Sequence, residues 1–207
     1  MSKTLLSAFL LATSAFGQYK LESAGPPPSE LAPAIRDALQ SEGAKIMANG
    51  GSVYAEVWLR KTAPSGPAST EQGVTLATVP HGSLLGAIRV GEGGQDRRGQ
   101  PIKAGVYTLR YSLFPPDGNH QGVALQRDFL HLLSAAGDKD LNSTPSFAEL
   151  MKTAKKTAGG GHPFILSLWK DEAGHPVELV QEGEDWVLYT KIGDLPVGII
   201  LVGIFVG

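Results

Sequence analysis

Residues 106–113 read VYTLRYSL, and their alternation decides the fold class of this chain. In an extended strand, successive side chains point to opposite faces, so a period of two predicts a β-strand. The turn signal PPDG at 115–118 ends this strand. The aromatic and leucine side chains that share one face, and that we expect to enter the core, are Tyr107, Leu109, Tyr111 and Leu113.

Residues 102–115, which begin with IKAGVYTL, resemble a phrase found in exported bacterial β-sandwich domains. The resemblance is to uncharacterised secreted families whose strand starts with Ala-Gly-x-Tyr-x-Leu, and more loosely to transthyretin-type sandwich modules. It implies a sandwich fold and carries over no catalytic residue. Gly105 suits the start of such a strand, because glycine permits a tight turn. The rest of the chain departs from the transthyretin-type pattern.

Further strands and two helices are predicted along the chain. The first helix is capped by Ser29 and ends by Gly43, and the second covers 145–158 with Thr144 as its cap. Many strands and only two helices predict a mainly β protein, an antiparallel β-sandwich or barrel-like sheet with two short helices. Alternation or short apolar runs predict the other strands at 44–47, 52–60, 74–79, 84–90, 129–133, 164–169, 177–181 and 186–191.

The apolar run VGIILVGIFV at 197–206 admits two interpretations. Its length is about half of what a membrane-spanning helix needs. A central strand that is buried on both faces accounts for such a run. The alternative is a seam between subunits or a membrane contact.

The first 17 residues have the order of a secretory signal peptide. Lys3 supplies the positive start, 5–12 the apolar run, and Ala15 and Gly17 the small residues of a cleavage site, so the mature chain would begin at Gln18. The alternative is an ordinary buried N-terminal helix. We expect an extended lead-in at 18–28, one β-rich domain at 29–207, and a secreted or periplasmic location.

Composition narrows the classes of partner and chemistry. The chain has no cysteine, which excludes disulfides, thiol catalysis and thiolate metal sites. Its formal charge is −2 and no basic cluster exceeds two residues in a row, which argues against nucleic acid as a partner. The mature chain is expected to carry no transmembrane segment, because no apolar run reaches the required length.

The segment 114–131 is the densest in functional groups. Asp117 and His120 are candidates for a metal site or a shared proton, and Arg127 is a candidate for gripping an anion. The structural alternative is that 117–119 form an ordinary turn and that Arg127 pairs with Asp128. The candidate ligand-binding residues are Asp117, Asn119, His120, Arg127, Asp128 and His131.

Two functions remain open from the sequence. The chain lacks the zinc-protease, phosphate-loop and nucleophile-elbow motifs, which favours a non-enzymatic module that binds a small molecule, a glycan or an envelope protein. The alternative is a metal-dependent or acid/base hydrolase that uses the Asp117–His131 segment, with any cofactor unidentified. Aromatic pairs at 54 and 58 and at 107 and 111 could form a sugar-binding face, but core packing is the favoured interpretation.

Overall fold

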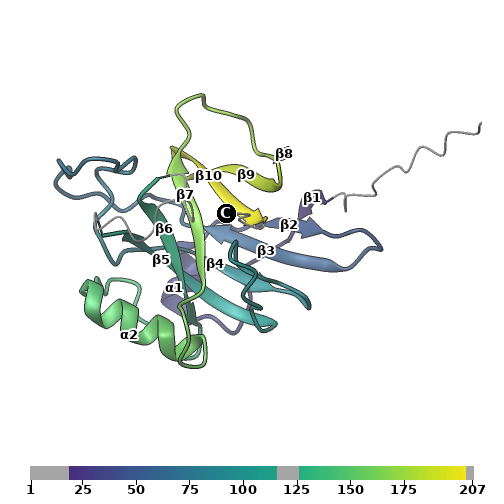
Figure 1. The fold of residues 1–207 in the computed structure, drawn as a ribbon, viewed down its shortest axis with the longest axis horizontal. Helices are drawn as coiled ribbons and strands as arrows, with labels where there is room; N and C mark the ends of the chain where they lie inside the picture. Colours follow the sequence, from purple (N-terminus) through teal and green to yellow (C-terminus); the bar gives the residue numbers. More distant parts are fainter. Residues whose placement is uncertain (1–18, 116–125, 204–207) are drawn as a thin grey trace, which may run out of the picture.

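The computed structural model describes residues 19–115 and 126–203. Ten antiparallel strands form a nearly closed, barrel-like sheet, which two short helices accompany, so the predicted mainly β class is confirmed (Figure 1). The strands are β1 (Lys20–Ser23), β2 (Ala44–Met47), β3 (Val53–Leu59), β4 (Leu84–Val90), β5 (Gly105–Leu113), β6 (Asp128–Ser134), β7 (Ile165–Lys170), β8 (Glu178–Glu182), β9 (Asp185–Ile192) and β10 (Leu195–Val202).

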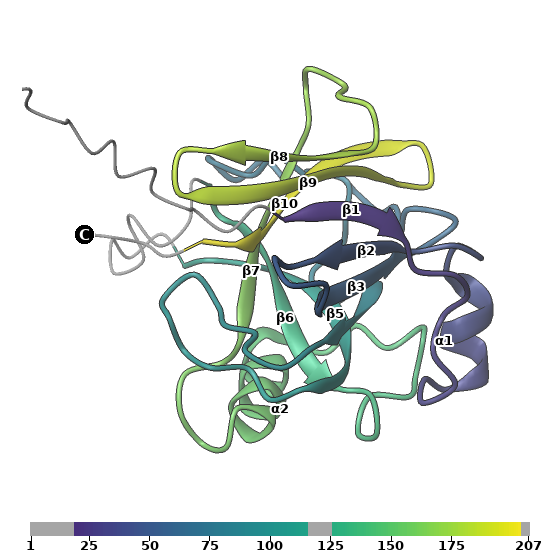
Figure 2. The same cartoon turned by 90° about the vertical axis from the view of Figure 1, so that its right-hand side faces the viewer.

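The strand order is β1-β2-β3-β4-β5-β6-β7-β10-β9-β8, so the first seven strands form a meander. The last three fold back, and β10 comes to lie between β7 and β9. The sheet therefore has β1 and β8 as its two ends, and the curvature of the barrel brings these ends near one another (Figure 2).

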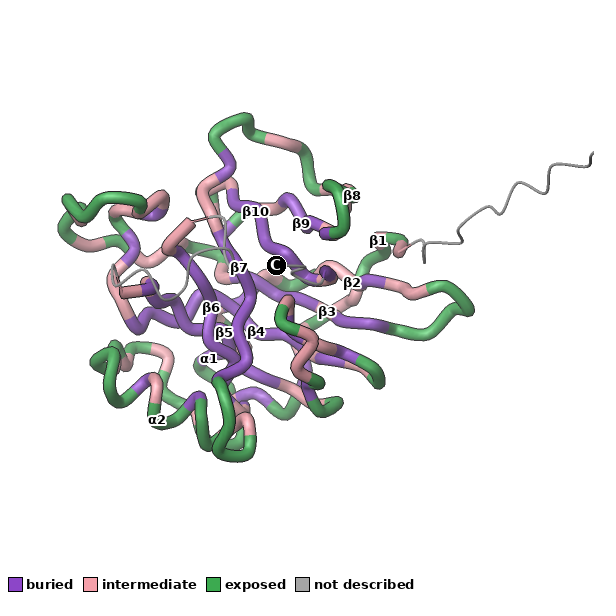
Figure 3. Tube along the Cα trace, viewed as in Figure 1, coloured by how far each residue is buried: buried purple, intermediate pink, exposed green. Residues whose placement is uncertain are grey.

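The apolar face of β5 lies in the barrel core, as its alternation predicts: Tyr107, Leu109 and Tyr111 are all buried there. The opposite face of β5 is also buried, although it is polar, and Thr108, Arg110 and Ser112 are at most 1% exposed. Figure 3 shows this burial along the central strands, with the exposed residues mostly on loops and on α2. The polar outer face of β5 is therefore covered by other parts of the chain.

Both helices are shorter than predicted. α1 (Pro33–Ala38) starts after Ala32 and not at Ser29, because Pro33 takes the first helical position. It packs Ile35 against Trp58 of β3. α2 (Phe147–Thr157) is capped by Ser146 and not by Thr144.

The cap of α2 is a capping box. The Ser146 side chain accepts a hydrogen bond from the backbone N–H of Glu149, and the Glu149 carboxylate accepts one from the Ser146 N–H. α2 covers β6 through Leu150 and Ala154, which pack on Leu133.

The predicted strand at 74–79 is wrong. These residues form bends and turns, yet Leu76 and Val79 are buried in the barrel core. Their apolar spacing reflects burial and not strand pairing. The lead-in at 18–28 in turn contains a short strand, β1, which the sequence did not reveal.

The apolar C-terminal run is a central strand. β10 pairs with both β7 and β9, and residues 197–201 are buried. This confirms the prediction of a strand buried on both faces, for the part of the run that is described.

The aromatic pairs belong to the packed interior. Tyr54, Trp58, Tyr107 and Tyr111 are each at most 8% exposed, so they do not form an open platform for sugars. No helix within 19–115 and 126–203 has the length and apolar character needed to cross a membrane.

Candidate functional site

The structure describes only half of the predicted site. Asp117, Asn119 and His120 lie outside the described residues. Arg127, immediately before β6, donates from Nε to the Phe114 carbonyl at 2.7 Å and from its Nη2 atom to Glu71 Oε2 at 2.8 Å. Its ion-pair partner is therefore Glu71, across the barrel end, and its role in the described structure is to tie the 71–72 loop to the end of β5.

Asp128 points into the barrel and is completely buried. Its Oδ1 accepts hydrogen bonds from the Tyr111 hydroxyl at 2.7 Å and from the Leu76 N–H at 3.0 Å, and its Oδ2 accepts one from the Thr75 N–H at 2.8 Å. Burial, and then the hydrogen bond to Asp128, raise the pKa of Tyr111, which keeps this phenol protonated. Asp128 thus pins the 74–79 segment, and this explains how that segment packs in the core without strand pairing.

His131 lies on the opposite face of β6, directly across from Arg110 of β5. Three positions separate it from Asp128, an odd spacing that places the two side chains on opposite faces of a strand, so the structure does not bring them together. The His131 ring is 1% exposed and meets the Phe129 ring edge-on at 4.8 Å.

Neither ring nitrogen of His131 has a hydrogen-bond partner among the described residues. Burial, with smaller contributions from the charges of His81 and Arg98, lowers the pKa of His131 to about 3. This histidine is therefore neutral throughout the physiological range, and proton transfer near pH 7 is not open to it.

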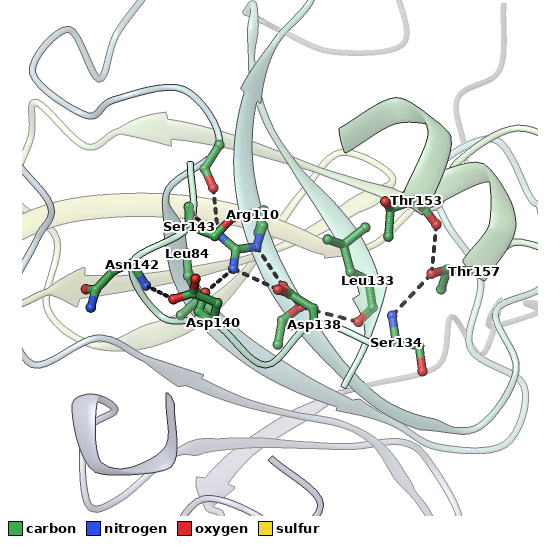
Figure 4. Close-up of polar contacts among 12 residues, drawn as sticks. Leu84, Arg110, Leu133, Ser134, Asp138, Asp140, Asn142, Ser143, Thr153 and Thr157 are labelled. Atoms are coloured by element: carbon green, nitrogen blue, oxygen red, sulfur yellow. Dashed lines mark hydrogen bonds and ion pairs between the residues drawn. The ribbon is translucent and has the colours of Figure 1, made fainter. Parts of the chain in front are cut away.

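Arg110 binds the loop residues 138–143, which cover this outer face (Figure 4). Its Nε and Nη2 donate to the Asp138 carboxylate at 2.6 and 2.7 Å, in a bidentate ion pair. Its Nη1 donates to the carbonyls of Gly82 and Ser143, and Nη2 donates also to the carbonyl of Asp140. A guanidinium has five N–H donors, and all five are used, so Arg110 is a structural clamp with no donor left for a ligand.

A serine–histidine pair lies at the next outward position of β5. His81 Nε2 is 3.0 Å from Ser112 Oγ, and the ring also has a hydrogen bond with the backbone of Pro145. Because proline offers only a carbonyl, the ring donates to Pro145 and Nε2 accepts the Ser112 proton. Burial lowers the pKa of His81, partly offset by that carbonyl. Ser112 is 0% exposed, so a substrate does not reach this hydroxyl.

An imidazole–carboxylate pair anchors the loop between β7 and β8. His175 Nδ1 is 2.9 Å from Asp171 Oδ1, and the His175 N–H donates to Asp171 Oδ2 at 2.6 Å. Burial alone would raise the pKa of Asp171, but the hydrogen bonds from His175 outweigh it and hold that pKa below its usual range. The His175 ring stacks on Tyr189 at 4.0 Å. These contacts fasten the loop to the outer face of β9.

A cleft of about 540 Å³ opens where the two ends of the sheet meet, and we call it the seam cleft. The lining residue Val177 is 59% exposed, and we call the other apolar side chains that line the cleft the floor and the polar ones the rim. The floor consists of Leu21, Ala44, Val57, Leu59 and Leu188. The rim consists of Glu22, Ser23, Gln40, Ser41, Glu42 and Thr190.

The seam cleft exists because the barrel does not close. β1 pairs only with β2 and β8 only with β9 in the described chain, although Cα atoms of β1 and β8 approach within 8 Å. Two edge strands that face each other without hydrogen-bonded pairing leave a gap in the wall of the barrel. Since the floor residues Val57, Leu59 and Leu188 also belong to the barrel core, the gap reaches the interior.

Sequence reasoning missed the seam cleft entirely. Its lining comes from five separate stretches of the chain, between Leu21 and Thr190, and no local motif marks them. Val177 follows a proline in the sequence, but the local pattern does not reveal that this apolar residue is exposed.

No group of three or more histidine, aspartate or glutamate side chains is placed to hold a metal ion within the described ranges. The metal candidates Asp117 and His120 fall outside those ranges and stay a prediction. Comparisons of the chain with models of protein families, with curated proteins and with solved structures found no match. The resemblance of 102–115 to exported sandwich domains therefore also stays a prediction.

Proposed function

We propose that this protein is an exported binding module that takes a small molecule into the seam cleft. The observation that carries the proposal is the combination of an apolar floor, a polar rim and a volume of about 540 Å³. Small-molecule sites in proteins typically measure roughly 300–1,000 Å³ and have mostly apolar walls with a few polar groups. Barrel-like sheets can hold a small ligand in their interior, and the seam cleft reaches the interior at Val57, Leu59 and Leu188.

Apolar side chains at the floor make the cleft suited to an apolar ligand body. Leu188 is 0% exposed and Val57 and Leu59 are each 3% exposed, so the floor is formed by the tips of core residues. A ligand that packs its own apolar body on these side chains, and covers the exposed Val177, takes that apolar surface out of water at a gain of about 25 cal/mol per Å². The rim then orients the ligand through hydrogen bonds.

The hydrolase alternative draws no support from the described part of the Asp117–His131 segment. Asp128 is engaged by three hydrogen bonds inside the barrel, and His131 lies on the other face with a strongly lowered pKa. Both observations favour structural roles for these two residues.

Export is the second part of the proposal, and the order of residues in 1–17 supports it. Expression of the full gene in a bacterium, followed by N-terminal sequencing of the protein outside the cytoplasm, tests it. We expect a chain outside the cytoplasm that begins at Gln18, and folded protein found only in the cytoplasm with Met1 intact would contradict export.

Ligand binding is tested with N-phenyl-1-naphthylamine, an uncharged probe that fluoresces in apolar surroundings. We expect the protein to bind the probe and the variant Thr190→Phe, which fills the cleft, to lose this binding. A second filling variant, Ser41→Trp, acts from the exposed rim and keeps the test valid if Thr190→Phe does not fold. Equal probe binding by folded filled variants and the parent protein would contradict the proposal.

A further inference from the structure

We propose that the ligand of the seam cleft is an organic cation, an amphiphile with a protonated amine and an apolar body. This inference rests on the proposed function and adds the charge of the ligand. It is carried by the unequal distribution of charge around the cleft opening.

The rim carries carboxylates and no basic residue. Glu22 and Glu42 both line the cleft, and none of the thirteen lining residues is lysine, arginine or histidine. Lys45 pairs with Glu22 at 3.0 Å and compensates one charge. Glu42 therefore leaves the lining residues, taken together with Lys45, with a net negative charge, which attracts a cation.

The rim offers hydrogen-bond acceptors to a donor. Glu42 accepts a hydrogen bond from the Ser23 hydroxyl, and a carboxylate has further lone pairs to offer. Gln40 donates one amide N–H to the Lys191 carbonyl at 2.9 Å, so its amide oxygen stays available as an acceptor beside its second N–H. An ammonium group has three N–H donors and no acceptor, so it matches such a rim, whereas a carboxylate ligand would meet like charge.

The width of the seam favours a small molecule over an inserted peptide strand. A strand between β1 and β8 would hold them about 9.6 Å apart, twice the usual spacing of neighbouring strands. Their Cα atoms already approach within 8 Å. The occupant therefore enters from the side of the cleft, with its apolar body towards Leu59 and Leu188 and its head group at Glu42.

The test compares three ligands that share one apolar body: octylamine, octanol and octanoate. Octylamine is protonated near neutral pH, as a lysine side chain is. We expect isothermal titration with the full chain to show octylamine binding roughly tenfold more tightly than octanol, with octanoate weakest, and a loss of the octylamine advantage at high salt. We expect Glu42→Gln and Glu22→Gln to weaken octylamine and leave octanol unchanged. The matched control is Glu172→Gln, an exposed carboxylate outside the cleft whose partner is Lys170.

The outcomes distinguish failure of the cationic inference from failure of the binding function. Equal affinities for the three ligands, all lost in Thr190→Phe, would overturn the cationic inference and keep the binding function. Tightest binding of octanoate, or an octylamine affinity that Glu42→Gln leaves unchanged, would likewise overturn the inference. Absence of binding by all three ligands would overturn both proposals.

Discussion

Replacing the buried His131 by leucine should remove a large part of the acid sensitivity of this protein. The ordinary pKa of histidine is about 6.5, and burial lowers that of His131 to about 3 in the folded state. Between these two pH values His131 is protonated in the unfolded chain and neutral in the folded protein. The free energy of unfolding therefore falls as the pH drops through this window and is fully present above about pH 6.5.

The magnitude follows from the two pKa values. At about pH 4 the difference in proton binding costs the folded state about 3 kcal/mol relative to pH 8. Leucine does not titrate, so His131→Leu should lose about 3 kcal/mol less than the parent protein between these pH values. At pH 8 the variant should be about as stable as the parent, because leucine also removes two buried nitrogens that have no described partner.

Urea unfolding at both pH values, followed by tryptophan fluorescence, measures this effect. The matched control is His162→Leu, which changes an exposed histidine. Other groups also contribute to acid sensitivity, so the informative quantity is the difference between parent and variant in their pH-dependent loss. An identical loss in the parent and in His131→Leu would refute the reasoning.

Three further predictions concern single interactions, each measured by urea unfolding. Arg110→Met should cost about 3–5 kcal/mol, because it leaves Asp138 without its bidentate partner, and an unchanged stability would contradict the clamp. Asp128→Asn should cost about 1–3 kcal/mol, because the amide meets a backbone N–H donor where the carboxylate accepted one. Amide exchange at 74–79 should rise in this variant, and unaltered protection there would contradict the pinning role. Gly198→Ala should cost about 1–3 kcal/mol and shift the fluorescence, since the new Cβ would lie 2.5 Å from the Trp169 ring.

The seam cleft and the outer polar face depend on residues that are distant in sequence. Arg110 reaches Asp138 and the carbonyls of residues 82 and 143 because β5 pairs with β4 on one side and with β6 on the other. The segment 114–131 was predicted to be a site because its carboxylate, imidazole and guanidinium side chains are close together in the sequence. In the structure Asp128 and His131 lie on opposite faces of β6, and closeness in sequence does not show this separation.

The sequence alone determined the mainly β class and the orientation of the β5 side chains. These follow from local steric rules, because alternation with a period of two is a property of each strand by itself. Only the tertiary structure decided that 74–79 pairs with no strand, that Arg110 is saturated and that the barrel stays open between β1 and β8. The physical reason is that strand neighbours and the partners of buried polar groups are chosen by the packing of the whole chain, which no short stretch of sequence encodes.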